Sequence, residues 1–294
     1  MELTLDSAVT LNNGVRMPLL GLGVYQAAPG KETFDAVSAA LKAGYRHIDT
    51  ARFYGNEKDV GRALRESGLP RDRVFITTKL WNNDHGYDAA LRAFDASLSD
   101  MGLDRIDLYL IHWPVKGKGH GGVAGVPDEV SGSIVGLRAE TWRALEQILV
   151  SDRCLAIGVS NYTIQHLRQL LDTATVVPAV NQVEFSPFLF QRDLLDFCLG
   201  QGIQMQAYSP LTRGHRLTDP TLVRMAEKHS RTAAQILLRW ALQHHVAVLP
   251  KSTQPERIRE NSHLFDFALS PDDMRTLNAL NENLHFCWDP TDAP

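Results

Sequence analysis

The sequence predicts an α/β protein with the fold of a (β/α)8 barrel, also called a TIM barrel. Eight short apolar runs alternate with longer amphipathic stretches along the 294 residues. Strands that each lead into a helix predict a parallel sheet, and eight such units in a chain of about this length are what a barrel requires. Seven of the eight runs also stop at side chains that ionise or form hydrogen bonds, as expected where barrel strands meet an active site.

The predicted strands are short and mostly apolar, which is typical of parallel strands buried on both faces. They span residues 19–23, 47–49, 74–79, 106–112, 156–160, 179–184, 204–209 and 246–251. The predicted helices carry apolar residues at helical spacing and span residues 32–43, 57–67, 88–101, 140–150, 164–172, 192–199 and 233–243. A last helix is predicted after residue 251, because Thr253-Gln-Pro-Glu256 is a capping-box sequence with a proline in the first turn.

Three further segments complete the predicted architecture. The Asn-Gly pair at 13–14 lies between apolar residues and predicts a β-hairpin that closes the bottom of the barrel. A doubly wound sheet is the alternative fold, but the GLGVYQ sequence at 21–26 lacks the third glycine of its phosphate-binding turn. The glycine-dense stretch 116–127 is predicted to be a loop that covers part of the mouth and moves. No linker divides the chain, so we expect residues 1–294 to form one domain.

The composition excludes several classes of protein. Hydrophobic residues make up 44% and charged residues 22% of the chain, and a formal net charge of −4 gives no overall basic field for nucleic acid. No stretch approaches the roughly 18 apolar residues of a membrane span, and the N-terminus shows no signal-peptide pattern. Three cysteines without a CxxC pair (Cys154, Cys198 and Cys287) favour a reducing compartment. We therefore expect a cytoplasmic protein, and a monomer by default.

The polar residues at the ends of the predicted strands provide a candidate active site, because these ends share one mouth in a barrel. Three of these residues are ionisable: Asp49, Lys79 and His112. Tyr54 follows Asp49 by five residues and lies in the same loop between strand and helix. The other polar residues at strand ends are Ser160, Asn161, Gln182, Glu184, Tyr208, Ser209, Lys251 and Ser252.

Asp49 and Lys79 belong to neighbouring strands and can form an ion pair, which by itself would be a structural salt bridge. The presence of Tyr54 and His112 at the same rim favours a catalytic role. A lysine ammonium beside a tyrosine hydroxyl stabilises the phenolate, so we expect a lowered pKa for Tyr54. A tyrosine tuned in this way can give and recover a proton at moderate pH.

Seven motifs follow one another along nearly the whole chain, and they are GYRHIDTARFYGNE (44–57), TTKLW (77–81), YLIHWP (109–114), IGVSNY (157–162), VNQVEFSP (180–187), AYSPL (207–211) and LPKSTQPERIRENSHLFDF (249–267). In this order they resemble the motifs of the aldo-keto reductases, NADPH-dependent carbonyl reductases built on a (β/α)8 barrel. Each motif is moderately specific, whereas the ordered set is strongly specific. The resemblance implies an oxidoreductase of the alcohol dehydrogenase or carbonyl reductase type.

The resemblance also implies a catalytic tetrad of Asp49, Tyr54, Lys79 and His112. Tyr54 would be the general acid when an aldehyde or ketone is reduced to the alcohol, and Lys79, paired with Asp49, would lower its pKa. His112 would donate a hydrogen bond to the carbonyl oxygen and orient it. The hydride would come from C4 of the nicotinamide of NADPH, while the protein supplies position and a proton.

A cofactor site follows from the same resemblance. Ser160, Asn161 and Gln182 match the residues that hold the carboxamide, and Tyr208 matches the aromatic residue that stacks on the nicotinamide, with packing at the barrel rim as the alternative. The positions expected near the rest of NADP+ or NADPH are Gly23, Ser209, Leu211, Lys251, Ser252, Arg257, Glu260 and Asn261. Lys251, Ser252 and Arg257 match the site of the 2′-phosphate, and a lysine and an arginine suit a dianion. NAD lacks that phosphate, so we expect a preference for NADPH.

The walls of the substrate pocket are expected to come from Tyr25, Phe53, Trp81, His112 and Trp113, although core packing is the alternative for the two tryptophans. Tyr25 departs from the family pattern, because many relatives carry tryptophan at this position. Cys287 and Trp288 either reach over the pocket or pack on the exterior of the barrel. The short loops suggest a small or medium aldehyde, ketone or keto sugar, and they do not choose among these.

Two other functions fit parts of the sequence. Lys79 could form a Schiff base with a carbonyl substrate, but an adjacent Asp49 would keep it protonated. Alternatively, the chain could have a non-enzymatic role, since some relatives of the family bind NADPH as redox-reporting subunits or serve as structural lens proteins, but the intact tetrad argues against this. His120 has no neighbour at zinc-ligand spacing, so no metal is expected.

Overall fold

The computed structural model describes residues 3–115 and 133–293. The glycine-dense stretch 116–127, with the predicted moving cover of the mouth and His120, lies outside the described residues.

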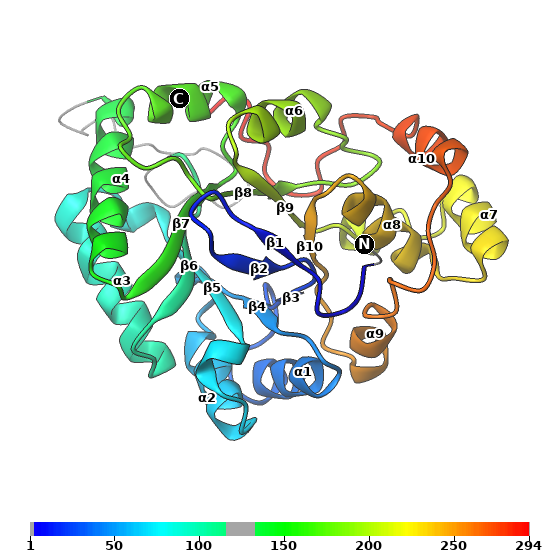
Figure 1. Ribbon diagram of the computed structural model, residues 1–294, viewed down its shortest axis with the longest axis horizontal. Coiled ribbons are helices and arrows are strands. Elements are labelled where there is room, and N and C mark those ends of the chain that lie inside the picture. Colours follow the sequence, from blue (N-terminus) through cyan, green and yellow to red (C-terminus); the bar gives the residue numbers. More distant parts are fainter. Residues whose placement is uncertain (1–2, 116–132, 294) are drawn as a thin grey trace.

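Eight parallel strands form the barrel, as Figure 1 shows in a view along its axis. They are β3 (Leu22–Gly23), β4 (His47–Asp49), β5 (Phe75–Leu80), β6 (Ile106–Ile111), β7 (Cys154–Ser160), β8 (Val180–Glu184), β9 (Gln204–Tyr208) and β10 (Ala247–Leu249). Each strand pairs with its neighbour in the chain, and parallel bridges from Leu20 to Val248 and from Gly23 to Lys251 join the first strand to the last. The predicted barrel is thus confirmed, and the doubly wound alternative is wrong.

Helices surround the barrel, and they are α1 (Lys31–Lys42), α2 (Glu57–Glu66), α3 (Tyr87–Met101), α4 (Ile134–Val150), α5 (Ile164–Leu171), α6 (Arg192–Gly200), α7 (Pro220–His229), α8 (Ala233–Gln243), α9 (Pro255–Glu260) and α10 (Pro271–Asn278). Most predicted helices are present within a few residues of their expected bounds. Helix α4 begins at Ile134, six residues earlier than predicted, because Ser133 caps it through the N–H of Gly136. Helices α7 and α10 were not predicted, although each begins with a polar capping residue followed by proline.

The capping box predicted at Thr253 to Glu256 is wrong. Helix α9 begins at Pro255, and Gln254 precedes it without a hydrogen bond from its side chain to the helix. The proline was correctly placed in the first turn, where its missing N–H costs nothing. The sequence pattern failed because it placed the capping residue one position too early.

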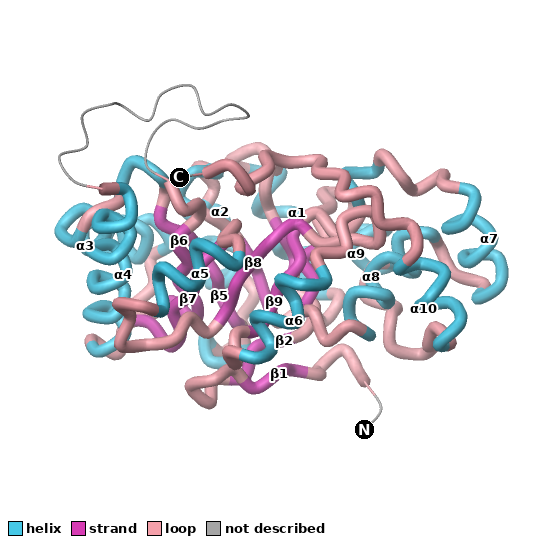
Figure 2. Tube along the Cα trace, turned by 90° about the horizontal axis from the view of Figure 1, so that it is seen from above, coloured by secondary structure: helices cyan, strands magenta, loops and turns pink. Residues whose placement is uncertain are grey.

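A two-stranded antiparallel hairpin, β1 (Ala8–Thr10) and β2 (Arg16–Pro18), closes the bottom of the barrel, as the side view in Figure 2 shows. Met17 is fully buried, and its sulfur lies 3.6 Å from Nε2 of Gln206 inside the barrel. The side chain of Asn12 donates a hydrogen bond of 3.1 Å to the carbonyl of Pro178. The predicted hairpin is therefore confirmed.

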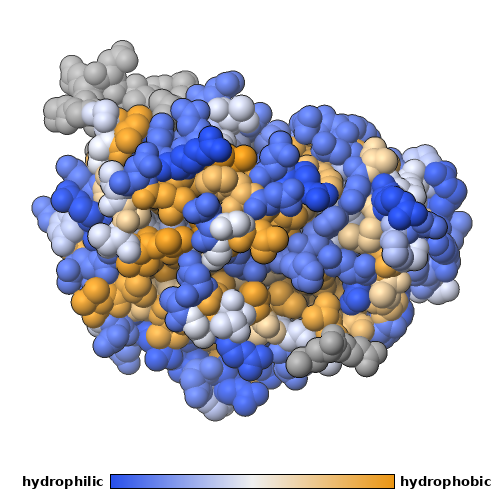
Figure 3. Space-filling view, turned by 45° about the horizontal axis from the view of Figure 1, so that its top comes forward, coloured by the Kyte–Doolittle hydropathy of each residue, from blue (hydrophilic) through white to orange (hydrophobic). Residues whose placement is uncertain are grey.

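Hydrophobic residues on the molecular face drawn in Figure 3 lie in clusters that hydrophilic residues border. Within residues 3–115 and 133–293, no helix is both long and apolar enough to cross a membrane.

We predict that His47 makes the stability of the barrel depend on pH. This histidine is fully buried at the floor, where Nε2 lies 2.9 Å from Oγ1 of Thr77, and burial lowers its pKa from 6.5 to about 4. Between these pH values the unfolded chain binds more protons than the folded chain, so the free energy of unfolding falls with decreasing pH, by up to about 3 kcal/mol. Urea unfolding of the His47→Gln variant between pH 4 and 7 should show a flatter pH dependence.

Exposed His263 provides the control for this experiment, because His263→Gln should keep the pH dependence of the wild type. An unchanged dependence in His47→Gln would show that other groups dominate acid unfolding.

Candidate active site

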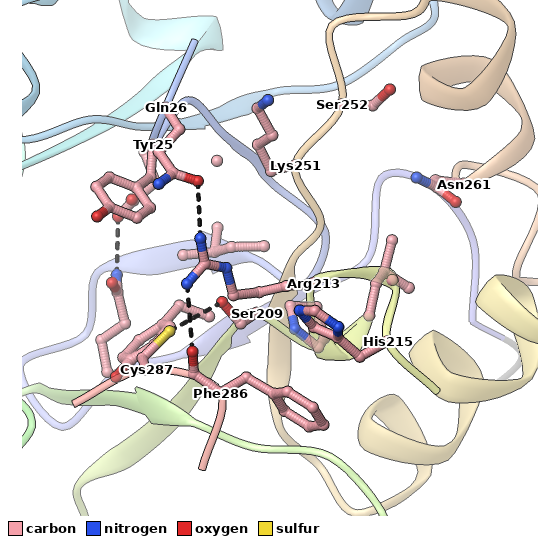
Figure 4. A pocket seen from close by; sticks show the side chains of 18 of the residues that line it. Tyr25, Gln26, Ser209, Arg213, His215, Lys251, Ser252, Asn261, Phe286 and Cys287 are labelled. Atoms are coloured by element: carbon pink, nitrogen blue, oxygen red, sulfur yellow. Dashed lines mark hydrogen bonds between the residues drawn. The ribbon is translucent and has the colours of Figure 1, made fainter. Parts of the chain in front are cut away.

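A cavity of about 1200 Å³ opens at the carboxyl ends of the barrel strands. Figure 4 shows part of it, with side chains from several strand–helix loops and from the C-terminal segment pointing inward. The predicted site residues that line it are Gly23, Tyr25, Asp49, Phe53, Tyr54, Trp81, His112, Trp113, Asn161, Gln182, Tyr208, Ser209, Leu211, Lys251, Ser252, Arg257, Glu260 and Asn261. Lys79 and Ser160 do not line the cavity, and both are fully buried in strands of the barrel.

Lys79 and Asp49 form a buried ion pair at the base of the cavity. The ammonium of Lys79, at 0% exposure, lies 2.6 Å from Oδ1 of Asp49 and 2.9 Å from the carbonyl of Thr50. The other carboxylate oxygen of Asp49 accepts a hydrogen bond of 2.8 Å from the amide of Gln182. Strands β4 and β5 bring the two charges together because they are paired neighbours in register. A charge without such partners would be strongly unfavourable inside the barrel.

Tyr54 lies next to this pair, with its hydroxyl 3.5 Å from the ammonium of Lys79. The predicted lowering of its pKa is not what this geometry gives. Burial raises the pKa of Tyr54 well above its usual value of 10, and the negative charge of Asp49 raises it further. Burial also lowers the pKa of Lys79 and raises that of Asp49, although the charge of each partner opposes the shift. The expectation neglected how completely the barrel removes water from these groups.

His112 lies beside Tyr54, with the two ring centroids 5.6 Å apart and the rings nearly perpendicular. Its backbone is fixed on both sides, because its N–H donates to the carbonyl of Leu80 at 3.1 Å and its carbonyl accepts from the amide of Asn161 at 2.9 Å. The imidazole and the phenol thus border the same part of the cavity. Asp49, Tyr54 and His112, three of the four predicted tetrad residues, line the cavity. The fourth, Lys79, lies behind this lining and contacts the hydroxyl of Tyr54.

Asn161, Gln182 and Tyr208 form a polar patch in the wall of the cavity. The hydroxyl of Tyr208 donates to Oδ1 of Asn161 at 2.7 Å, and Asn161 adopts a left-handed backbone with φ of 64°. The hydroxyl of Ser160 donates to the carbonyl of Gln182 at 2.7 Å, so this hydroxyl is used within the barrel wall. The ring of Tyr208 and the amides of Asn161 and Gln182 thus line the same cavity.

The far end of the cavity carries cationic side chains. Lys251 follows β10, and Arg257 lies in the short helix α9 with Asn261 just after it. The carboxylate of Glu260 accepts a hydrogen bond of 2.9 Å from the hydroxyl of Thr232. Two exposed cations at one end of a long cavity are suited to binding a phosphate group.

Aromatic rings form the walls around Tyr54. Phe53 and Trp81 stack with centroids 3.9 Å apart, and the ring centroid of Tyr25 lies 5.0 Å from that of Tyr54. Trp288 packs against Trp113 at a centroid distance of 4.6 Å. Trp288 and Cys287 both line the cavity, so the alternative in which they pack on the exterior is wrong.

Sequence reasoning missed a contact that crosses the cavity. The guanidinium of Arg213 donates to Oε1 of Gln26 at 3.1 Å and to the carbonyl of Phe286 at 3.2 Å, and Figure 4 shows Arg213 between these two groups. The contact joins the loop after β3, the loop after β9 and the C-terminal segment. No motif could have revealed it, because an arginine in a polar loop has no distinguishing pattern.

Asn56 was also missed, although it holds two loops that carry cavity residues. Its buried amide donates to the carbonyls of Val24 and Ala27 at 3.1 and 3.3 Å, and its Oδ1 accepts from the hydroxyl of Thr50 at 2.7 Å. These bonds fix the loop that carries Tyr25 against the loop that carries Tyr54. The only sequence signal was the polar GNE stretch directly after Tyr54.

Comparison with known proteins agrees with this arrangement. Residues 19–282 match the model of the aldo/keto reductase family. The chain is 47% identical to a glyoxal reductase of Bacillus subtilis (strain 168), over 96% of both chains. It is 44% identical to a morphine 6-dehydrogenase of Pseudomonas putida, over 97% of this chain and 95% of the relative. A crystal structure of a Bombyx mori aldo-keto reductase in complex with NADP superposes with a TM-score of 0.87 at 35% identity, covering 97% of this chain and 95% of that one.

These matches extend over nearly the whole barrel and include its active-site strands. The chain belongs to the aldo/keto reductase family. It is therefore an oxidoreductase of the kind that acts on small carbonyl compounds.

We predict that Asn56→Ala lowers the free energy of unfolding by about 2–4 kcal/mol, because several buried polar groups lose their partner at once. Asn13→Ala is the matched control, since the side chain of Asn13 donates an exposed hydrogen bond to Leu155 in the hairpin region. Its loss should be below about 1 kcal/mol. Equal losses in the two variants, measured by urea unfolding, would contradict the assigned role of Asn56.

Proposed function

We propose that this protein is an NADPH-dependent reductase that converts aldehydes and ketones to alcohols, with Tyr54 as the proton donor. One observation carries the proposal. Tyr54 lines the cavity beside His112, and its hydroxyl lies 3.5 Å from the ammonium of Lys79, which is paired with Asp49. A phenol, an imidazole and an ammonium at one point are the groups that acid catalysis at a carbonyl oxygen requires.

The raised pKa of Tyr54 suits a proton donor, because the hydroxyl stays protonated at neutral pH. Reduction of a carbonyl generates an alkoxide, which is more basic than a phenolate, so the proton moves from Tyr54 to the oxygen. The ammonium of Lys79 then stabilises the phenolate that forms. His112 lies beside Tyr54 and lines the same cavity, where it would orient the carbonyl oxygen by a hydrogen bond.

The donor set of the cavity fits NADPH. Lys251, Ser252 and Arg257 would hold the 2′-phosphate, and Glu260 and Asn261 would contact the adenine. Asn161 and Gln182 would bind the carboxamide, and the ring of Tyr208 would stack on the nicotinamide. When bound, NADPH supplies the hydride from C4 of its nicotinamide. The NADP complex of the Bombyx mori relative supports this choice of cofactor.

The substrate is proposed to be a small or medium aldehyde, ketone or keto sugar. Support comes from the aromatic walls of Tyr25, Phe53, Trp81 and Trp113, and from two relatives whose names refer to glyoxal and to morphine. Such different molecules suggest that a common reactive group, rather than one overall shape, is recognised across the family.

The buried position of Lys79 argues against a Schiff base. Its nitrogen does not line the cavity, and the carboxylate of Asp49 at 2.6 Å favours the protonated, non-nucleophilic form. A role in binding NADPH without turnover would leave Tyr54 and His112 without a purpose.

We further infer that the protein is a monomeric, single-domain protein of the cytoplasm. Its cysteines at 154, 198 and 287 are unpaired, which supports a reducing compartment. Among the described residues, no group of histidines, cysteines and carboxylates could hold a metal ion.

We predict that Tyr54→Phe abolishes reduction, with a loss of kcat of about a thousandfold or more, because the proton donor is removed. NADPH binding, followed by quenching of tryptophan fluorescence, should change by less than about threefold. Substantial turnover of a generic aldehyde by this variant would contradict the assignment of Tyr54 as proton donor.

We predict that Arg257→Ala raises the Kd for NADPH about ten- to a hundredfold and leaves the Kd for NADH nearly unchanged, because only NADPH carries the 2′-phosphate. Arg259→Ala is the matched control, since Arg259 is an exposed arginine of the same helix α9 that does not line the cavity. Titration of both cofactors into both variants measures the effect. An unchanged NADPH affinity in Arg257→Ala would make the phosphate-site assignment wrong.

A further inference from the structure

Glu184 is a buried carboxylate near the mouth of the barrel that the proposed reaction does not use. It is the last residue of β8 and is 3% exposed. Its Oε1 accepts a hydrogen bond of 2.9 Å from the N–H of Phe286, and its Oε2 accepts one of 3.1 Å from the N–H of Cys287. Both oxygens of a single carboxylate thus bind two consecutive backbone groups of the C-terminal segment, which we define as residues 281–289.

The C-terminal segment depends on such partners because it contains no helix or strand. Its backbone N–H groups are therefore not paired by a helix or a sheet. A partly buried N–H group without a hydrogen-bond acceptor would lower the stability of the fold. His285 adds an electrostatic contact, since its Nδ1 lies 3.8 Å from Oε2 of Glu184, and Glu184 raises its pKa. Hydrogen bonds to an ionised acceptor are stronger than those between neutral groups.

The residues next to this anchor form one side of the cavity. Trp288 packs on Trp113 at the substrate end. The carbonyl of Phe286 accepts a hydrogen bond from Arg213, and its ring is stacked on that of His215 with centroids 5.4 Å apart. Glu184 therefore holds the segment against the loop after β9, and Figure 4 shows Phe286 next to Arg213 and Cys287 next to Ser209.

The upstream part of the C-terminal segment has separate attachments. The N–H groups of Glu282 and Leu284 both donate to the carbonyl of Phe188, at 3.1 and 3.0 Å. The side chain of Asn281 accepts a hydrogen bond of 3.0 Å from the N–H of Phe190. Loss of the Glu184 carboxylate should therefore free the N–H groups of Phe286 and Cys287 and leave those of Glu282 and Leu284 bound.

We propose that Glu184 is a positioning residue whose carboxylate fixes Phe286 and Cys287, so that Trp288 closes the substrate part of the cavity. The kinetic consequence rests on the proposed reductase function, whereas the anchoring itself does not. The carboxylate acts through Trp288 and contacts neither the tetrad nor the cations at the far end of the cavity.

Hydrogen–deuterium exchange of the full chain tests the anchoring without substrate or cofactor. In Glu184→Gln, one amide oxygen replaces two carboxylate oxygens, and the NH2 group faces a second donor. The N–H groups of Phe286 and Cys287 should exchange about tenfold faster or more, while those of Glu282 and Leu284 keep their rates. Equal protection of Phe286 and Cys287 in variant and wild type would overturn the proposal, whether or not the protein is a reductase.

Steady-state kinetics test the consequence for the substrate. Glu184→Gln should raise the KM for 2-naphthaldehyde about tenfold, because this two-ring aldehyde needs the wall that Trp288 provides. The KM for propanal and the kcat for both substrates should change by less than about twofold. Glu227→Gln, on the exposed side of helix α7, is the matched control and should change none of these constants.

Two further variants test whether Glu184 acts through Trp288 and through the backbone of residue 286. Trp288→Ala should raise the KM for 2-naphthaldehyde to a similar extent, and its combination with Glu184→Gln should add little, since both remove the same wall. Additive effects would overturn the proposed route through Trp288. Phe286→Pro serves as the test if Glu184→Gln does not fold. Proline has no backbone N–H, so this variant loses the hydrogen bond from residue 286 to Glu184. The N–H of Cys287 must then exchange faster than in the wild type. Unchanged exchange there would equally overturn the proposal.

Discussion

The ion pair between Lys79 and Asp49 is the interaction on which the active site depends. Two opposite charges can exist at the dry base of the cavity only because paired strands hold them 2.6 Å apart and Gln182 binds the remaining carboxylate oxygen. The position of the ammonium in turn determines which hydroxyl lies near its positive charge, and this is the hydroxyl of Tyr54. The barrel is therefore more than a support for the site, since its strand register determines which charges meet at the base of the cavity.

The barrel and the participants of the site could be predicted from the sequence because both follow from local patterns. Apolar runs define strands, and the polar residue that ends each run lies at the mouth, as Asp49, His112 and Gln182 do. The electrostatics could not be predicted in the same way. The pKa of Tyr54 depends on how much water the surrounding loops exclude, and that quantity is a property of the complete fold. The first residues of the helices were also hard to predict, because a single residue such as Ser133 determines where a helix begins.

Contacts between loops were the part of the site that the sequence did not reveal. Asn56, Arg213 and Glu184 each bind backbone or side-chain groups from segments far away in the chain. Their partners are mainly backbone groups, which every residue type carries, so no pairing of side-chain types marks them in advance. The cavity thus combines an ion pair fixed by the pairing of β4 and β5 with walls fixed by a few polar side chains that join separate loops.

The attachment of the C-terminal segment through its backbone has a consequence for how the lining of the cavity can vary. Glu184 binds the N–H groups of residues 286 and 287, and almost any side chain at these positions would leave those groups in place. The side chains are therefore free to vary while the segment stays docked over the cavity. A barrel with this arrangement can change the lining of its cavity through its C-terminal segment, without disturbing the ion pair at the base of that cavity.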